Sequence, residues 1–414
     1  MVRILLIVPD SSYRTAAFSR AAEKLKFEYT IASTGGVHSP IESGIGIALR
    51  SLQPAEMLAV ILEQHKRTPF DGVIGTDDST VGLAAKVAAH LNLRGNSAES
   101  VRAATRKDVS RRVLAESGMP VPGHRLVTLE GEGKYDLGDV SYPCICKPTE
   151  LSASRGVIRA DSPIELKNAM KRVQRILMEE RAEPNPTVLV EDYIPGQEVA
   201  VEGLLYDGEL ALLAVFDKPD ELEGPYFEET TYVTPSRHPK SVLLSVQESL
   251  ATACTRLGLR WGPIHAECRL NESGVWIIEI ACRSIGGRCG KLLEFSTGQS
   301  LEQIILTNAV GGRSDYSLIV EAAGVMMIPV PGKGGVLRRV EGIGMAARTP
   351  LVSSVEIDVR PGQMLVPWPE GCPYPGFIFA AGKDPESVEK ALRSAHQKLD
   401  FVLAPMLPLK VSNV

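Results

Sequence analysis

The sequence predicts a chain of mixed α/β and α+β class that begins with a Rossmann-like parallel sheet and folds as three domains. Three observations support this prediction. Short apolar runs alternate with stretches of helical periodicity up to about residue 95, which is typical of a helix-flanked parallel sheet. Near residue 97 the pattern changes to helices followed by paired strands, and after Gly311-Gly312 the chain becomes rich in Gly and Pro. The expected domains are therefore residues 1–96, 97–312 and 313–414.

The composition is that of a globular protein without a strong electrostatic preference for a partner. Of its 414 residues, 44% are hydrophobic and 23% are charged, and the formal net charge is −5. The first apolar run, Ile4 to Val8, is far shorter than the roughly 20 residues that cross a bilayer. The seven cysteines are scattered and form no CxxC pair, so we expect reduced, structural thiols. We expect a cytoplasmic protein that binds neither nucleic acid nor a membrane.

The first domain is expected to contain alternating strands and helices. The strands are residues 2–8, 29–32 and 70–75, and the helices are residues 12–26, 54–66 and 79–91. The turn after the first strand, Pro9-Asp10-Ser11-Ser12, lacks the GxGxxG fingerprint, so a nicotinamide oxidoreductase has little support. Asp77 and Asp78 follow the last strand, where open sheets bind ligands. They either meet a substrate ammonium group or, as we favour, cap the next helix.

The later elements follow from the same periodicities. Expected helices are residues 98–105, 107–116, 161–181, 242–257 and 385–399, and expected strands are residues 124–128, 142–147, 187–193, 198–206, 209–217, 325–330 and 355–359, with a strand pair across 264–281. Asp207-Gly208 predicts a tight hairpin turn. The helix 161–181 has one apolar face, and its basic side, which includes Arg172 and Arg175, is expected to face solvent.

Two glutamates in the strand pair point to a metal site. If residues 272–274 form a three-residue hairpin loop, Asn271 pairs with Val275, and counting back places Glu267 opposite Glu279. Opposed residues have Cβ atoms roughly 4.5–5.5 Å apart, so two carboxylates there repel each other unless a cation lies between them. The hairpin therefore predicts that both carboxylates bind one cation.

The ligand type narrows the choice of cation. Carboxylate oxygens without a cluster of His or Cys favour Mg²⁺ or Mn²⁺ over zinc. Mg²⁺ with few protein ligands is usually completed by phosphates, which predicts a nucleotide site. The alternative is that Glu267 forms an ordinary ion pair with Arg269 or Arg283. Neither a Walker P-loop nor the kinase signature set is present in the sequence.

Five elements that suit a nucleotide site occur in order along the chain. They are Lys107-Asp108, Lys147-Pro148, the loop Ser152 to Val157, the stretch Val190 to Glu198, and the two-glutamate hairpin followed by Arg283. In this order they resemble the ATP-grasp superfamily of carboxylate–amine ligases over most of residues 97–312. His265-Ala266-Glu267, the Ala-x-Arg-x-x-Gly-Gly pattern of residues 281–287, and Pro331-Gly332-Lys333-Gly334-Gly335 resemble the L-amino-acid ligase branch, which makes dipeptides. The resemblance implies a three-domain ATP-grasp architecture with a C-terminal α+β domain.

The resemblance also implies roles at the nucleotide. Lys107 and Lys147 would contact the ATP phosphates, and the loop Ser152 to Gly156, including Ser154, would be a mobile flap with backbone N–H donors over the triphosphate. The hinge that holds adenine would consist of Glu191, Tyr193 and Ile194, with Glu198 accepting from the ribose hydroxyls. From the residues alone, Lys107 is equally well explained as a solvated helix residue and Glu191 as a charge at a strand edge.

For catalysis, the resemblance implies that Glu267 and Glu279 hold Mg²⁺. Arg283, together with Lys147, would stabilise the charge on the transferring phosphoryl group and on an acyl phosphate. Two departures from the superfamily stand out. Ala281 replaces an Asn that is a further metal ligand in many members, and the flap has a single glycine with bulky Arg155 beside it.

Substrate contacts are expected in the charged segment 217–231. There Glu228 or Glu229 would hold an amine and Lys218 a carboxylate or phosphate, unless the segment is simply a charged surface loop. His265 shares a strand face with Glu267 and is either a substrate contact or a structural histidine. The paired glycines Gly286 and Gly287 are further candidates for substrate binding.

The predicted function is ATP- and Mg²⁺-dependent ligation of a small-molecule carboxylate to an amine, both expected to be amino acids. An acyl phosphate would form, and ADP and phosphate would be released. The alternatives are a biotin-carboxylase or purine-type ATP-grasp enzyme that activates bicarbonate or formate, and a non-catalytic nucleotide-binding protein. We expect a homodimer.

Overall fold

The computed structural model separates into two compact units, each built from several stretches of the chain. The first unit comprises Met1–Val121, Glu198–Val215 and His238–Ile319, and the second comprises Pro122–Gln197, Phe216–Arg237 and Val320–Val414. The structure describes residues 1–9, 12–34, 45–49, 52–129, 135, 137–180, 186–293, 298–314, 321–371 and 374–404. The three predicted domain ranges remain a prediction.

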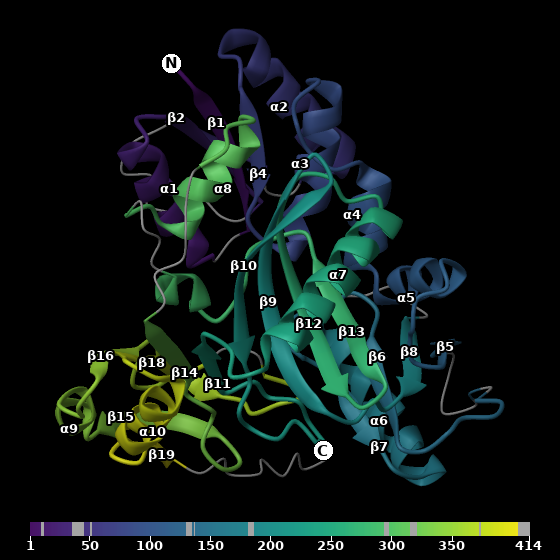
Figure 1. Cartoon of the computed structure of the whole chain (residues 1–414), viewed down its shortest axis with the longest axis vertical. Helices are drawn as coiled ribbons and strands as arrows, with labels where there is room; N and C mark the ends of the chain where they lie inside the picture. The colour runs from purple at the N-terminus through teal and green to yellow at the C-terminus, as the bar shows by residue number, and fades with distance from the viewer. Residues whose placement is uncertain are drawn as a thin grey trace, which may run out of the picture. The chain divides into compact units, whose positions relative to one another are not determined.

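The first unit opens with the predicted parallel sheet. Its strands are β1 (Arg3–Val8), β2 (Glu28–Ser33), β3 (Ile45–Ala48) and β4 (Gly72–Gly75), in the order β3-β2-β1-β4. The helices α1 (Arg14–Lys24), α2 (Pro54–Arg67) and α3 (Asp78–His90) follow them, as expected. A later helix, α8 (Leu301–Ala309), was not predicted and packs against α1 and β4 (Figure 1). It approaches closely because Gly72 has no side chain: a Cβ there would lie 3.2 Å from the Ala309 carbonyl oxygen.

The remainder of the first unit contains a second set of strands with helices packed against it. The strand order is β13-β12-β9-β10, and the elements are α4 (Ala98–Thr105), α5 (Lys107–Glu116), α7 (Lys240–Arg256), β9 (Gln197–Tyr206), β10 (Glu209–Asp217), β12 (Gly262–Asn271), β13 (Gly274–Ala281) and a 3₁₀ turn, η1 (Cys289–Leu292). The tight turn at Asp207-Gly208 is confirmed, since both residues have positive φ (52° and 90°). Apolar side chains from β9, α7 and β12, such as Val201, Leu250 and Ile264, are fully buried in one core.

The second unit contains a four-stranded antiparallel sheet in the order β5-β8-β6-β7. The strands are β5 (His124–Thr128), β6 (Cys144–Pro148), β7 (Ile158–Ala160) and β8 (Thr187–Asp192). Helix α6 (Pro163–Glu179) packs on β6 and β7 and begins at Ser162, whose hydroxyl accepts from the Glu165 N–H. Its predicted apolar face is buried, with Met170 and Val173 in the core.

The rest of the second unit is α+β, as predicted. Strands β11 (Thr231–Thr234), β14 (Ala322–Met327), β18 (Gly376–Gly382) and β16 (Val352–Ile357) are neighbours in that order, and β17 (Met364–Leu365), β15 (Gly335–Glu341) and β19 (Asp400–Ala404) form a smaller sheet, with α9 (Ile343–Ala347) and α10 (Pro385–His396). Helix α10 packs closely on β14, where a Cβ at Gly324 would meet Val388 and Leu392 at 2.9 Å.

Two general expectations can be compared with the described residues. The six described cysteines are free thiols and all are buried. None of the helices within the described ranges is both long and apolar enough to cross a membrane.

Candidate functional site

The β12–β13 hairpin places Glu267 directly opposite Glu279, as the sequence predicted. The predicted loop was wrong, because Asn271 pairs with Gly274 and the turn has two residues rather than three. A β-bulge compensates: Cys268 pairs with Ile277, and Ile278 is the extra residue before the glutamate pair. The turn is one residue shorter than predicted and the bulge adds one residue, so the two differences cancel and the two carboxylates still share one face of the hairpin.

Helix α5 holds β13 at this bulge. Arg111 is 1% exposed, and its guanidinium donates to the carbonyl oxygens of Ile277 at 3.0 Å and Ile278 at 2.6 Å. One turn earlier, the Lys107 ammonium donates to Glu279 Oε1 at 3.1 Å. Lys107 is therefore not a solvated helix residue: it is buried and ion-paired with one of the predicted metal ligands.

Arg283 is held by a carboxylate that the sequence did not connect with it. Its Nε and Nη2 lie 3.0 and 2.9 Å from Asp78 Oδ2, and its Nη1 donates to the Ser284 carbonyl. Burial opposes ionisation of Asp78, but the positive charges of Arg283, Lys107 and Arg14 together outweigh burial and hold the Asp78 pKa below its ordinary value. Asp78 thus keeps Arg283 oriented from the first residue of α3.

The two neighbouring aspartates therefore have different contacts: Asp78 pairs with Arg283, whereas Asp77 caps a helix. Asp77 is the N-cap residue of α3, as we favoured, and its carboxylate also accepts from Ser12 and Thr76 and pairs with Arg14. The Arg14 guanidinium lies 3.4 Å from the carbonyl oxygens of Ser284 and of the next residue. Arg14, the first residue of α1, thus supports the loop that follows Arg283.

A buried glutamate that the sequence analysis missed supports the same loop. Glu202 of β9 is completely buried, and its Oε2 accepts from the Ile285 N–H at 2.9 Å. Burial raises the pKa of Glu202 well above its ordinary value. Beyond Ile285, a Cβ on Gly286 would find only ordinary contacts, and Gly287 has a left-handed φ of 57°. An acidic residue within an apolar strand was the signal that could have identified Glu202.

The other predicted residues of the first unit gather around Glu267. His265 Nε2 lies 3.9 Å from Glu267 Oε1, and His265 Nδ1 lies 4.0 Å from Glu202 Oε2. Glu198 accepts from Arg269 Nε at 3.0 Å, and carboxylate oxygens of Glu198 and Glu267 lie within 4.8 Å of each other. The carboxylates of Glu198, Glu202 and Glu267 therefore lie in this part of the first unit beside Arg269 and the His265 imidazole, and these oxygen donors suit a hard divalent cation.

In the second unit, Lys147 and Glu191 form an ion pair with each other, and both side chains are only 4% exposed. They share a sheet face because Glu191 of β8 pairs with Ile145, two residues before Lys147 on β6. Nearby, the Tyr193 N–H donates to the Pro143 carbonyl at 3.1 Å, and the Arg159 guanidinium lies 4.4 Å from the centre of the Tyr193 ring. Glu191 is thus a buried charge rather than a strand-edge one.

The predicted flap is a compact turn. Ala153, Ser154 and Gly156 have positive φ values of 55°, 54° and 74°, and a Cβ on Gly156 would lie 2.9 Å from the Pro148 ring. The single glycine is therefore needed where the flap rests on the residue after Lys147. The Gly156 N–H donates to the Pro369 carbonyl at 3.1 Å.

The ends of the charged segment 217–231 are not a solvated surface loop. Lys218 is buried, pairs with Glu229 and lies 5.1 Å from the centre of the Tyr232 ring. Burial raises the pKa of Glu228, whose Oε1 is buried without a hydrogen-bond partner. The middle of the segment, by contrast, is exposed.

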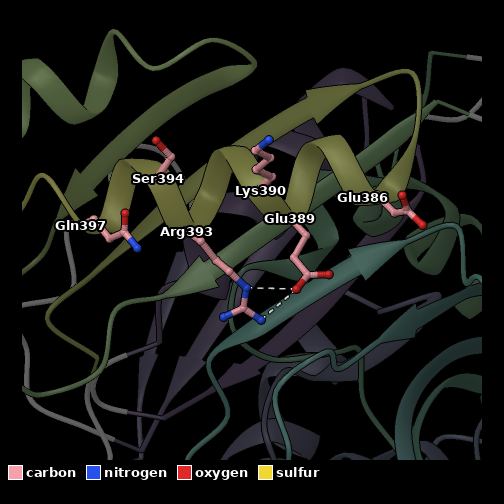
Figure 2. Close-up of a pocket in the computed structure, with 6 residues that line it drawn as sticks. All are labelled: Glu386, Glu389, Lys390, Arg393, Ser394 and Gln397. Atoms are coloured by element: carbon pink, nitrogen blue, oxygen red, sulfur yellow. Dashed lines mark hydrogen bonds and ion pairs between the residues drawn. The ribbon is translucent and has the colours of Figure 1, made fainter.

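A shallow pocket on α10 gathers none of the predicted site residues. Figure 2 shows its lining, which is Glu386, Glu389, Lys390, Arg393, Ser394 and Gln397. Arg393 pairs with Glu389 through Nε at 3.0 Å and Nη2 at 2.8 Å, and also with Asp220 at 2.7 Å. This ion network ties α10 to the segment 217–231.

Comparison with known proteins identifies two regions of the chain. The family model for the ATP-grasp domain matches residues 140–291, and the model for the L-amino acid ligase C-terminal domain 2 matches residues 327–404. The dapdiamide A synthase of Enterobacter agglomerans is 25% identical, over 81% of this chain and 80% of that protein. The alanine–anticapsin ligase of Bacillus subtilis (strain 168) is 25% identical, over 61% of this chain and 56% of that protein.

A solved structure agrees with these matches. The L-amino acid ligase from Bacillus licheniformis superposes with a TM-score of 0.81, at 25% identity, over 98% of this chain and 100% of that one. The chain thus combines an ATP-grasp domain with an L-amino acid ligase C-terminal domain. It is an ATP-dependent ligase that forms carbon–nitrogen bonds and uses ATP with a divalent metal.

Proposed function

We propose that this ATP-grasp ligase joins the carboxylate of one amino acid to the amine of another through an acyl phosphate. The γ-phosphoryl group of ATP is transferred to a carboxylate oxygen and ADP leaves. The amine then attacks the acyl carbon, phosphate departs, and an amide remains. The observation that carries this proposal is the opposed Glu267 and Glu279, with Lys107 bonded to Glu279 and Arg283 fixed by Asp78.

The metal-binding roles belong to Glu267 and Glu279. Two facing carboxylates, with Glu198 within 4.8 Å of Glu267, suit Mg²⁺, which takes oxygen ligands, and Mn²⁺ is acceptable for the same reason. When bound, the metal supplies positive charge that neutralises the phosphates. We assign Lys107 to the same phosphates because its ammonium already faces one of the two glutamates.

The remaining nucleotide contacts are proposed from the family resemblance and the local geometry of each residue. Lys147 is assigned to the phosphates, and Ser152, Ser154 and Gly156 to the flap over them. Glu191, Tyr193 and Ile194 are assigned to the adenine ring, and Glu198 to the ribose. The Lys147–Glu191 pair supports this assignment, because a buried cation and a buried anion on one sheet face match a ligand that carries both an anionic group and a hydrogen-bond donor.

Arg283 is assigned to the developing charge on the phosphoryl group and the acyl phosphate. The Asp78 carboxylate restrains its guanidinium before any ligand arrives, and preorganised charge is the most effective form of electrostatic stabilisation. The loop from Ser284 to Gly287, held by Arg14 and Glu202, would place Gly286 and Gly287 beside a substrate.

The amino-acid substrates are proposed from the chemistry of the remaining polar groups. His265, Glu228 and Glu229 can accept from an ammonium group, and Lys218 can bind a carboxylate. The named relatives include an alanine–anticapsin ligase and an L-amino acid ligase, which supports amino acids as both partners.

The test is phosphate release from Mg·ATP with amino acids supplied singly and in pairs, followed by mass spectrometry of the products. We expect release that requires a particular pair, and a product mass equal to that pair minus water. If bicarbonate or formate stimulates release and no pair does, the chain activates a different acid. If ATP binds and nothing stimulates release, amide ligation is the wrong assignment.

A further inference from the structure

The segment Trp368–Glu370 contacts the flap of the second unit with three consecutive residues. Trp368 Nε1 donates to the Ala153 carbonyl at 3.0 Å, the Pro369 carbonyl accepts from the Gly156 N–H at 3.1 Å, and the Glu370 carbonyl accepts from Arg155 Nε at 2.9 Å. The segment lies more than 200 residues beyond the flap in the chain, within the L-amino acid ligase C-terminal domain 2.

The segment is itself fixed on both sides. The Trp368 side chain is 4% exposed and its ring lies 4.8 Å from that of Tyr374, centre to centre. The Glu370 carboxylate forms a two-point ion pair with Arg172 of α6, whose Nη2 lies 2.7 Å from Glu370 Oε2. The Arg172 hydrogen bonds lower the pKa of Glu370, so the pair is ionised at neutral pH. The basic side of α6 is exposed at Lys171 and Arg175, as expected, whereas Arg172 is half-buried by its pair with Glu370.

The flap needs support of this kind. Ala153 and Ser154 have φ values of 55° and 54°, a left-handed conformation that costs a non-glycine residue energy unless its surroundings enforce it. The Trp368 indole binds the carbonyl of the first of these residues. On the other side, Arg155 also pairs with Glu180, just after α6. The flap is thus fastened between α6 and the distant segment.

We propose that Trp368–Glu370 is a positioning strap that holds the flap Ser152–Gly156 in place for phosphoryl transfer. This inference rests on the proposed function, in which the flap covers the ATP phosphates. The strap touches neither reacting atom, so it acts through the flap: it keeps the flap backbone in register with the phosphates and keeps water away from them.

Loosening the strap has a defined chemical consequence. In the coupled reaction the γ-phosphoryl group passes to the substrate carboxylate, and phosphate leaves only when the amine attacks. If water reaches the γ-phosphorus instead, its oxygen takes the phosphoryl group, a proton is released, and ADP and phosphate form without an amide. A weakened strap therefore raises the KM for ATP and raises the ratio of phosphate released to amide formed.

Two substitutions test the strap. Trp368→Phe keeps an aromatic ring against Tyr374 and removes the hydrogen bond to Ala153, and Glu370→Gln keeps the backbone contact to Arg155 but weakens the ion pair with Arg172. One net hydrogen bond is worth about a fivefold change in an equilibrium constant, so we expect the KM for ATP to rise about fivefold in each variant. We also expect the phosphate-to-amide ratio to rise above one.

Matched controls exist elsewhere in the chain. Trp276→Phe also removes one indole hydrogen bond, to Asn271 at the hairpin turn, and Glu209→Gln also weakens a glutamate–arginine pair, with Arg313. Both controls should leave the KM for ATP and the phosphate-to-amide ratio as in the wild type.

Hydrogen exchange of a peptide covering residues 151–157 provides a readout independent of activity. The strap predicts faster exchange in Trp368→Phe and Glu370→Gln than in the wild type, with the controls unchanged. If hydrogen exchange of this peptide is unchanged in both variants, the strap proposal is wrong. It is also wrong if exchange is faster but the KM for ATP and the phosphate-to-amide ratio are unchanged. If the wild type forms no amide with any pair, the ligase assignment fails on its own, and exchange with and without Mg·ATP still shows whether the strap orders the flap around nucleotide.

Discussion

In the first unit Lys107 meets Glu279 where the carboxylate is 27% exposed, whereas in the second unit Lys147 meets Glu191 with both side chains only 4% exposed. Water can reach the Glu279 carboxylate of the first pair, so a metal can replace Lys107 as its partner at modest cost. The second pair can be opened only by a ligand that compensates both buried charges at once. We therefore expect the first unit to tolerate loss of its charges structurally while losing catalysis, and the second to lose stability.

The strongest test of this contrast is Glu279→Gln. Removing one metal carboxylate should lower kcat by about 10³-fold, a typical effect of losing a main charge-stabilising group, with little change in the urea midpoint. Product formation by mass spectrometry and urea denaturation measure the two effects. Glu209→Gln is the control for charge loss. Amide formation at the wild-type rate by Glu279→Gln, with Mg·ATP bound, would remove the metal assignment.

Lys147→Met should produce the opposite pattern. It leaves Glu191 buried without its partner, which costs about 3–5 kcal/mol of unfolding free energy. The double variant Lys147→Met with Glu191→Met should recover much of that loss, because no unpaired charge remains. Urea denaturation of the two variants and the wild type gives the comparison. A single variant as stable as the wild type would show that the buried pair contributes nothing to the free energy of unfolding.

Asp78→Asn should have a smaller effect, confined to the first unit. The amide still accepts a hydrogen bond from Arg283 but no longer holds it by charge, so we expect kcat to fall about tenfold with a smaller change in the KM for ATP. Asp207→Asn is the matched control, because it breaks an exposed pair with Arg260 at a turn that Asn also adopts. Equal kcat values in the two variants would mean that Arg283 does not depend on Asp78.

The smallest expected effect is a pH dependence of stability. The folded-state pKa of Asp78 is lower than its unfolded value, so its contribution is present above the unfolded pKa and is lost as the pH falls through the folded pKa. The difference in unfolding free energy between wild type and Asp78→Asn should be constant above about pH 5 and shrink in more acidic solution. Glu370→Gln should behave similarly, since the Arg172 hydrogen bonds lower the pKa of Glu370. Urea titrations at several pH values decide both cases.

Local sequence patterns predicted most elements of the fold. The ranges of α4, α5, β5 and β10 agree residue for residue with the sequence analysis, because each is bounded by a clear turn or cap signal. Most of the elements that were not predicted are short or lack a clean period, and they are the helices α8 and α9, the turn η1 and the strands β3, β7, β11, β15, β17, β18 and β19. Their positions depend on packing against elements far away in the chain.

The candidate site was predictable where its residues lie in one hairpin and not where they come from separate segments. The opposition of Glu267 and Glu279 followed from strand pairing, although the predicted turn was one residue too long. Nothing local connects Asp78 with Arg283, which is 205 residues later, or Trp368 with Ala153, which is 215 residues earlier. Such contacts are specified by the tertiary fold, so single-sequence patterns contain no signal for them.

The bulge at Ile278 also makes the placement of the two glutamates independent of the length of the hairpin turn, whereas in a regular ladder the turn length would set the pairing of every residue. Arg111 donates to the carbonyl oxygens of Ile277 and Ile278, next to the glutamate pair. These contacts, and not the turn at residues 272–273, fix the position of the glutamates. A longer loop inserted at that turn would extend outward without changing which face the two carboxylates occupy. The hairpin tip is therefore a suitable attachment point for a spectroscopic label or an affinity tag in an active enzyme.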